Sequence, residues 1–323
     1  MIPPATDDIG AENRVPFKLI PAEGALQCEW INTRNKRFDE PFFDDTASAL
    51  RILDPKNRKE HRVTSLGQLT EEAQGLDAIT PAVIIFHVSR CGSTLVSQLL
   101  ATSERFIVLS EVPFFDEILC LPFSIPGVNE TAILGYFSSA LNFYGRKRYT
   151  TEEHVVMKTD CWHIFFYSAL RSLFPATPFV MIYRSPDEVL RSNLNRAGRQ
   201  AIPELVDPRI FGLPGTPDHY QREIYTATII EKMLAKFLEV AGTDDNCMLA
   251  NYNEGALAMV KKIAAFANIA LSGEEIEMME QRSHYHSKKP GELFTGEPAA
   301  EVPECLFGAM RLYDSLEKKR KMT

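Results

Sequence analysis

Residues Pro81–Leu100 pass from an apolar strand, through a short turn, directly into an amphipathic helix. The segment Val83–Val88 is mostly β-branched or aromatic, as in a buried parallel strand, and leucines then recur at helical spacing. The turn between them gathers backbone N–H groups at the positive end of a helix dipole, where Gly92 permits close approach and Arg90 adds a cation. The sequence therefore predicts a loop that binds a phosphate or sulfate group.

This loop departs from two other kinds of anion-binding loop. A Walker A loop ends in Gly-Lys-Ser/Thr, but Ser93 stands where the lysine should be, and His87 or Val88 where the first glycine should be. A thiolate at a helix N-terminus would suit a cysteine-dependent phosphatase. That loop needs an arginine six residues after the cysteine, and Ser97 follows Cys91 at that distance. We therefore interpret Cys91 as a small loop residue.

A second strand, turn and helix are predicted in Pro178–Asn193. Arg184 would end the strand, and Ser192 follows eight residues later, about two turns into the helix. A guanidinium fork and a hydroxyl in these places suit one phosphate group. Pro186 fits the first turn of the helix, where its missing N–H has no intrahelical partner to lose. The alternative is an ordinary strand-to-helix connection with a surface arginine.

Together, the two segments resemble the donor-binding motifs of sulfotransferases that use 3'-phosphoadenosine 5'-phosphosulfate (PAPS). The first resembles their 5'-phosphosulfate loop in its Arg-Ser-Gly-Ser/Thr-Thr-Leu form, and the second resembles their 3'-phosphate motif. The resemblance implies a P-loop-type three-layer α/β/α fold with a mainly parallel sheet. It also implies that the donor contacts the loop and the second motif at Ser89, Arg90, Cys91, Gly92, Ser93, Thr94, Arg184 and Ser192.

Glu111 follows the apolar run Phe106–Ser110, which is the next predicted strand. In the tyrosylprotein branch of the family, a glutamate at this location is the proposed general base. The chemistry needs such a group, because the acceptor hydroxyl loses its proton as the new S–O bond forms. The alternative is a glutamate that caps a helix beginning near Pro113.

Lys158 closes the predicted strand His154–Lys158 and resembles the family's lysine that contacts the bridging oxygen or the sulfuryl group. With Arg90, it would stabilise the charge that develops during transfer. Asp160 stands where many relatives have proline or a catalytic histidine, which shifts the role of base to Glu111. We expect Asp160 to cap the following helix and His163 to be a packing or surface residue, while a catalytic role for either stays open.

Two C-terminal segments complete the expected donor site. Tyr252 resembles the tyrosine of the family's strand-Tyr-Glu-x-Leu segment and would pack on adenine, or it is an ordinary buried tyrosine. The stretch Ser283–Phe294 is polar, basic and loop-like, so that Ser287 and Lys288 are candidates to cover the 3'-phosphate; a solvated surface loop is the alternative.

The composition limits the class of protein and its expected location. With 323 residues, 45% of them apolar, the chain can bury a large core, and its net charge of −8 argues against a nucleic-acid partner. We expect no membrane span and, because the N-terminus lacks a secretory signal, a cytoplasmic location. Six scattered cysteines fit reduced thiols better than disulfides or zinc. The expected chemistry needs no metal.

The pattern of predicted elements divides the chain into an N-terminal accessory region, residues 1–78, and a sulfotransferase-like α/β domain, residues 79–323. The accessory region contains short strand candidates at Phe17–Ile20, Leu26–Ile31 and Phe38–Phe43, and helix candidates at Asp45–Ile52 and Ser65–Gly75. Beyond it, strands and helices alternate, as in an open parallel sheet.

These features predict a PAPS-dependent sulfotransferase whose acceptor is a hydroxyl or amine of a small molecule, a lipid or a sugar. Two alternatives stay open: a P-loop kinase with a degenerate loop, and a non-catalytic nucleotide-binding protein that docks a partner. The role of the N-terminal region and the oligomeric state, a homodimer included, are not fixed by the sequence.

Overall fold

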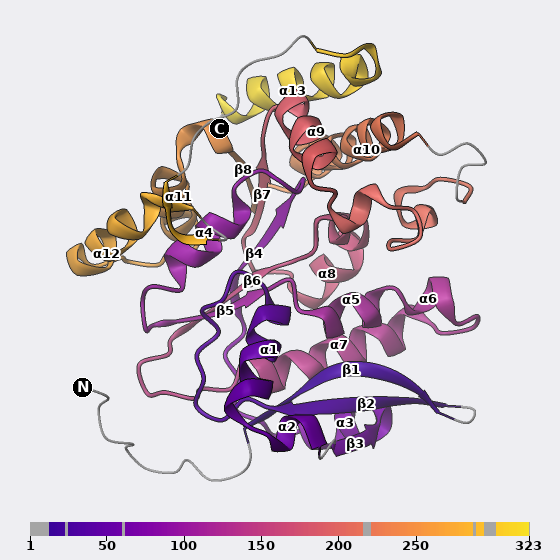
Figure 1. Cartoon of the computed structure of the whole chain (residues 1–323), viewed down its shortest axis with the longest axis vertical. Helices are drawn as coiled ribbons and strands as arrows, with labels where there is room; N and C mark the ends of the chain where they lie inside the picture. The colour runs from indigo at the N-terminus through magenta and orange to yellow at the C-terminus, as the bar shows by residue number, and fades with distance from the viewer. Residues whose placement is uncertain are drawn as a thin grey trace.

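The computed structural model describes residues 13–22, 25–59, 62–215, 221–286, 289–293 and 302–322. Its centre is a five-stranded sheet in the order β5-β6-β4-β7-β8, in which all neighbouring strands are parallel (Figure 1). Nearly every strand residue is buried, as expected for a parallel sheet covered on both faces. The strands are β4 (Pro81–His87), β5 (Phe106–Ser110), β6 (His154–Lys158), β7 (Phe179–Tyr183) and β8 (Cys247–Asn251).

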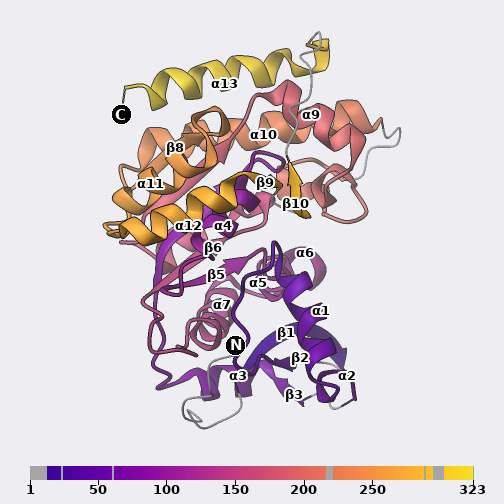
Figure 2. The same ribbon diagram turned by 60° about the vertical axis from the view of Figure 1, so that its left-hand side comes forward.

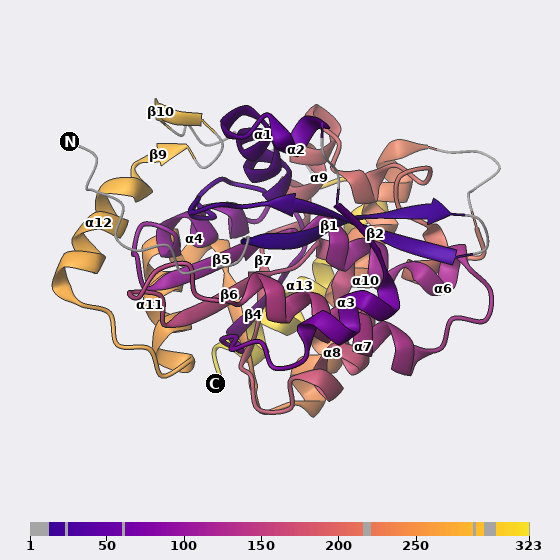
Figure 3. The ribbon, with the colours of Figure 1, turned by 90° about the horizontal axis from the view of Figure 1, so that it is seen from below.

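Helices cover both faces of this sheet (Figure 3). One layer contains α4 (Ser93–Leu100), α11 (Ala256–Phe266) and α12 (Gly273–Ser283), and the other contains α8 (Tyr167–Leu173), α10 (Arg222–Thr243) and α13 (Phe307–Arg320). Helix α9 (Pro186–Asn195) packs on α10. The predicted three-layer α/β/α fold with a parallel sheet is therefore confirmed. None of the helices in the described part of the chain is both long enough and apolar enough to cross a bilayer.

The N-terminal region forms a separate antiparallel sheet with the order β1-β2-β3 (Figure 2). The sheet packs against α5 and α7, and one continuous core joins it to the rest of the molecule. For example, the rings of Trp30 and Phe143 lie 4.7 Å apart. The N-terminal region contains β1 (Arg14–Ala22), β2 (Ala25–Asn32), α1 (Phe43–Leu53), α2 (Lys56–Lys59), β3 (Arg62–Ser65) and α3 (Leu66–Ala73). The neighbouring helices from later in the chain are α5 (Pro113–Leu119), α6 (Leu121–Ser124) and α7 (Glu130–Tyr144).

Two of the three strands expected in this region are confirmed, within β1 and β2. The third, Phe38–Phe43, is not a strand: α1 begins at Phe43, and the ring of Phe38 packs 5.3 Å from that of Phe43. Strand β3 was not predicted, because Arg62–Ser65 is short and polar and pairs only with β2.

The segment expected as a loop at Ser283–Phe294 is more ordered where the structure describes it. Helix α12 extends to Ser283, and β9 (Tyr285–His286) pairs with β10 (Lys289–Leu293) in an antiparallel hairpin. The candidates Ser287 and Lys288 lie outside the described residues. Short 3₁₀ helices connect other elements: η1 (Cys161–Phe166), η2 (Arg199–Ala201), η3 (Pro208–Phe211), η4 (Tyr252–Glu254) and η5 (Glu304–Leu306).

Candidate active site

A cavity of about 1090 Å³ opens at the C-terminal ends of the parallel strands, where ligands bind in open α/β sheets. Its lining divides into two ends, which we name by their chemistry. The loop end contains Arg90, Gly92, Arg184, Ser192 and Tyr252. The carboxylate end contains Phe42, Glu111, Asp160, Trp162 and Arg199. Segments far apart in the sequence therefore meet in a single site.

The loop between β4 and α4 adopts an unusual backbone. Ser89, Arg90 and Gly92 have φ angles of 63°, 52° and 80°, in the left-handed region that residues with a side chain rarely adopt. The first N–H groups of α4, from Ser93 and Thr94, have no partner within the helix and lie at the cavity wall. Strained backbone of this kind collects at ligand-binding sites. The loop thus forms a cradle of N–H groups at a helix N-terminus, as an anion requires.

The Cys91 side chain takes no part in the cavity lining. It is fully buried, and its thiol contacts the backbone oxygen of Ile182 at 3.3 Å. Burial raises the pKa of Cys91 to about 11, so that the thiol stays protonated at neutral pH. These observations support its interpretation as a small loop residue, which leaves the backbone as its means of contacting a ligand.

Arg90 ties the loop to the second motif. Its Nη2 donates to the backbone oxygens of Ser192, at 3.3 Å, and Arg196, at 2.6 Å. These carbonyls lie at the C-terminal end of α9, where the Ser192 oxygen also accepts from the Arg196 N–H. In this arrangement the guanidinium holds α9 against the loop, in addition to its expected role toward the sulfuryl group.

Arg184 and Ser192 both line the loop end of the cavity, as the second motif predicts. Arg184 Nη2 donates to Glu188 Oε1 at 2.6 Å, which fixes the guanidinium. Its Nε is buried and has no hydrogen-bond partner within the described residues. A buried donor of this kind is costly unless a ligand or water satisfies it. The pair therefore fits a phosphate at this position.

Tyr252 lies across the loop. A Cβ atom placed on Gly92 would come within 2.4 Å of Tyr252 Cδ2, so the ring occupies the space that a side chain would need. The Arg184 guanidinium carbon lies 4.4 Å from the centre of the same ring. A reciprocal capping box between Asn251 and Glu254 fixes the turn that carries the tyrosine. Tyr252 thus joins the two halves of the expected donor site, and its packing on adenine stays a prediction.

At the carboxylate end, Glu111 and Lys158 form an ion pair through Glu111 Oε1 and Lys158 Nζ. Lys158 is fully buried, is not among the described lining residues, and lies 5.0 Å from the centre of the Phe42 ring. The Glu111 side chain is 21% exposed at the cavity wall, and its backbone has a φ of 50°. Burial alone would raise the pKa of Glu111, but the Lys158 cation and His87 outweigh it and hold the pKa below its ordinary value. Glu111 is therefore ionised.

His87, which the sequence analysis did not select, positions this pair. Its Nδ1 accepts from the Ser89 N–H at 3.0 Å, so the neutral ring carries its proton on Nε2. Nε2 lies 3.0 Å from the Thr159 backbone oxygen and 3.3 Å from Glu111 Oε1. Burial lowers the pKa of His87, which keeps the ring neutral. Lys158 and His87 both contact Oε1, and within the described residues Oε2 has no hydrogen-bond partner.

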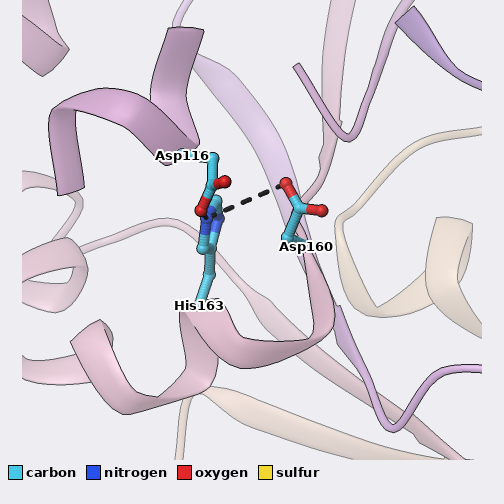
Figure 4. Close-up of side chains that lie close together, drawn as sticks. All are labelled: Asp116, Asp160 and His163. Atoms are coloured by element: carbon cyan, nitrogen blue, oxygen red, sulfur yellow. Dashed lines mark hydrogen bonds and ion pairs between the residues drawn. The ribbon is translucent and has the colours of Figure 1, made fainter. Parts of the chain in front are cut away.

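A buried polar cluster stands behind the carboxylate end (Figure 4). Asp116 Oδ1 accepts from Trp162 Nε1 at 2.6 Å and contacts His163 Nε2 at 3.1 Å, while Oδ2 accepts from Arg199 Nη2 at 3.2 Å. Burial alone would raise the pKa of Asp116, but the His163 and Arg199 contacts prevail and lower it to about 2. Asp116 is therefore an ionised and well-satisfied anchor.

Asp160 belongs to the same cluster but makes no such bonds. It precedes η1, yet its side chain accepts no capping hydrogen bond, so the prediction of a helix cap is wrong. Its carboxyl turns instead toward the cluster, where Oδ2 lies 3.8 Å from His163 Nε2 and Oδ1 lies 3.9 Å from Arg199 Nη1. His163 itself is buried against Asp116, consistent with a packing residue.

The cluster is also the place where a metal ion would have its ligands. The ligand atoms of Asp116, Asp160 and His163 lie within 4.8 Å of one another. However, Asp116 already accepts four hydrogen bonds, the fourth from the Cys120 thiol at 3.3 Å, and the guanidinium of Arg199 supplies positive charge beside both carboxyls. We therefore describe the cluster as a hydrogen-bonded network.

Two more cations line the cavity and were not selected from the sequence, Arg196 and Lys261. The segment that carries Arg196 follows α9, and Lys261 lies on α11. No motif marks them in the sequence, since each becomes part of the site only when helices pack around the sheet.

No protein-family profile and no curated protein matches this sequence. Three of the solved structures that match in fold are sulfotransferases. The one from Alicyclobacillus acidocaldarius is 13% identical, with 76% of this chain and 95% of that chain covered and a TM-score of 0.43. STF9 from Mycobacterium avium is 13% identical, with 79% of each chain covered and a TM-score of 0.48. Mouse SULT7A1, solved with 3'-phosphoadenosine 5'-phosphate (PAP), is 12% identical, with 80% and 90% covered and a TM-score of 0.36. The sequence identities are only 12–13% and the TM-scores lie below 0.5, so these matches show a similarity and no function.

Proposed function

We propose that this protein is a sulfotransferase that moves a sulfuryl group from PAPS to a hydroxyl or amine. The observation that carries the proposal is the convergence of four strand-end features in one cavity: the strained anion loop, Arg184 with Ser192, the Arg90 link between them, and the ionised Glu111. The loop would hold the 5'-phosphosulfate on its N–H groups, and Arg184 and Ser192 would hold the 3'-phosphate.

Glu111 would act as the general base. Oε1 is anchored by Lys158 and His87, which leaves Oε2 for the acceptor proton. As charge develops on the leaving phosphate, Lys158 Nζ would turn its hydrogen bond from Glu111 toward the bridging oxygen. That shift stabilises the leaving group and raises the basicity of Glu111 in the same step. Holding donor and acceptor in one cavity would supply the in-line geometry.

A kinase fits the site less well. Ser93 occupies the place of the Walker A lysine, so the loop itself offers no lysine to an ATP γ-phosphate.

The test is transfer of label from donor to a mixture of small hydroxyl and amine compounds. The protein would be incubated with ³⁵S-labelled PAPS and, in parallel, with γ-³³P-ATP and magnesium. We expect sulfated products from PAPS, reduced in Glu111→Gln, and no transfer from ATP. Transfer from ATP would contradict the proposal, as would wild-type protein that moves no label from PAPS to any acceptor.

A further inference from the structure

Asp160 stands out among the buried acids of this protein because neither of its carboxyl oxygens has a hydrogen bond to the described residues. The residue is 3% exposed and Oδ2 is buried without a partner; His163 Nε2 lies 3.8 Å from Oδ2, and Arg199 Nη1 lies 3.9 Å from Oδ1. Its neighbour Asp116, in the same cluster, accepts from four donors. A buried polar group without partners opposes folding, so its presence calls for an explanation.

Asp160 also reaches the cavity. It lines the cavity together with Glu111: Ser110 and Lys158 pair on adjacent parallel strands, Glu111 directly follows the first strand, and Asp160 lies two residues beyond Lys158. In Figure 4 one oxygen of Asp160 faces His163, which is the buried Oδ2, and the other is turned away from His163. Oδ1, which lies 3.9 Å from Arg199 Nη1, is thus the oxygen left for a ligand in the cavity.

We propose that Asp160 recognises the acceptor through a hydrogen bond to a second polar hydrogen, so that the acceptor is a vicinal diol or 1,2-amino alcohol, as in a sugar. The inference rests on the proposed function and names its substrate class. Adjacent strands lie about 4.8 Å apart. Both acids line one cavity, so in the proposed complex one hydroxyl would face Glu111 Oε2 and the donor on the neighbouring carbon would face Asp160 Oδ1.

The charge state of Asp160 suits this role. Burial, followed by the negative charges of Asp116 and Glu111, raises the pKa of Asp160 well above its ordinary value. A protonated carboxyl both donates and accepts, as a neighbouring hydroxyl or amine does. Glu111 remains the ionised partner, so the two acids take different tasks.

The experiment uses matched acceptors and matched variants. Calorimetric titration with PAP comes first, on wild type, Asp160→Leu, Asp160→Asn and Asp116→Asn. Sulfation from labelled PAPS is then compared between trans-1,2-cyclohexanediol or trans-2-aminocyclohexanol and cyclohexanol. We expect kcat/KM to be at least about tenfold higher for the paired donors, and this preference to vanish in Asp160→Leu, which can neither donate nor accept, while PAP affinity is unchanged.

Thermal unfolding provides a readout that needs no acceptor. Asp160→Asn should be at least as stable as wild type, because no bond is lost, whereas Asp116→Asn should unfold at a lower temperature. Equal use of diol and mono-alcohol, no transfer to either paired donor in a protein that binds PAP, or an Asp160→Asn as unstable as Asp116→Asn would each overturn the inference. One equivalent of bound Zn²⁺ or Mn²⁺ that depends on Asp160 would assign the carboxyl to a metal and also overturn it. Failure of wild type to bind PAP would instead sink the proposed function.

Discussion

The two ends of the cavity are built differently. The loop end consists of two strand–turn–helix units and of Tyr252 after β8, and its chemistry lies in backbone N–H groups and in arginines near strand ends. The carboxylate end draws on the chain before α1, on β5, β6 and η1, and on the segment after α9. Under the proposed function, local motifs would hold the donor, while a wall that only the folded chain assembles would select the acceptor.

Removal of the Glu111 carboxylate should show most clearly that the two ends of the cavity act independently. Glu111→Gln is expected to slow sulfuryl transfer by about 10²- to 10⁴-fold, the usual contribution of a general base, with PAP affinity unchanged. Single-turnover rates and calorimetry measure the two effects. Glu117→Gln, on α5 and outside the lining of the cavity, should keep the wild-type rate. Equal loss of binding and rate in Glu111→Gln would show that the ends are not independent.

Loss of the Lys158 cation should destabilise the carboxylate end. Lys158→Met leaves Glu111 without its buried counter-ion and should lower the free energy of unfolding by about 3 kcal/mol. The double variant with Glu111→Gln should recover much of that loss in denaturant unfolding. Lys236→Met, which breaks an exposed pair with Glu239, should change stability little. If Lys158→Met is as stable as wild type, the pair of Lys158 and Glu111 does not stabilise the fold.

A side chain at Gly92 should disable the loop end. Gly92→Ala forces a Cβ into the Tyr252 ring at a residue with φ 80°, and should cost about 2 kcal/mol of stability and at least tenfold in PAP affinity. The control is Gly127→Ala, whose φ is 87° but whose Cβ would meet no atom within 4 Å. Similar losses in both variants would assign the effect to backbone strain alone.

Acid should weaken the cluster behind the carboxylate end. The pKa of Asp116 is lowered from 3.8 to about 2, so its contribution is complete above pH 4 and is lost as the pH falls toward 2. That contribution amounts to about 2 kcal/mol. Asp116→Asn should show a flatter decline of unfolding free energy between pH 4 and pH 2. If the unfolding free energy of Asp116→Asn falls with pH as steeply as that of wild type, protonation of Asp116 is not what weakens the cluster.

The smallest effect should come from the hydroxyl of Ser192. Ser192→Ala removes one hydrogen bond to the expected 3'-phosphate and should weaken PAP binding by about 1 kcal/mol without changing affinity for adenosine 5'-phosphate. Calorimetry with both nucleotides measures the difference. An equal loss for both nucleotides would place Ser192 elsewhere in the donor site.

The sequence analysis selected those candidate site residues that belong to short, local motifs. Arg184 and Ser192 lie eight residues apart on one strand and helix, and Glu111 directly follows a strand, so their spacing together with the resemblance to family motifs predicted their places. His87 could not be recognised in this way, because its role depends on Thr159 and Glu111, which the sheet brings to it. Asp160 was assigned to capping by its position before a helix, whereas the fold turns its carboxyl toward His163.

The role of the N-terminal region was equally beyond the sequence. Phe42 precedes α1, far from any motif, yet its ring lies beside Lys158 and it lines the cavity. The region shares a core with α5 and α7, and no short sequence pattern encodes that packing. The region is thereby a candidate wall of the acceptor pocket.

The most direct test of the account is a paired calorimetric titration of wild type and Arg184→Ala with PAP and with adenosine 5'-phosphate. The account predicts that wild type binds PAP at least about tenfold more tightly, because only PAP carries the 3'-phosphate that Arg184 and Ser192 would hold. Arg184→Ala should bring the two affinities together. Equal affinities in wild type, or a preference for PAP that survives in Arg184→Ala, would contradict the donor site and with it the proposed sulfotransferase.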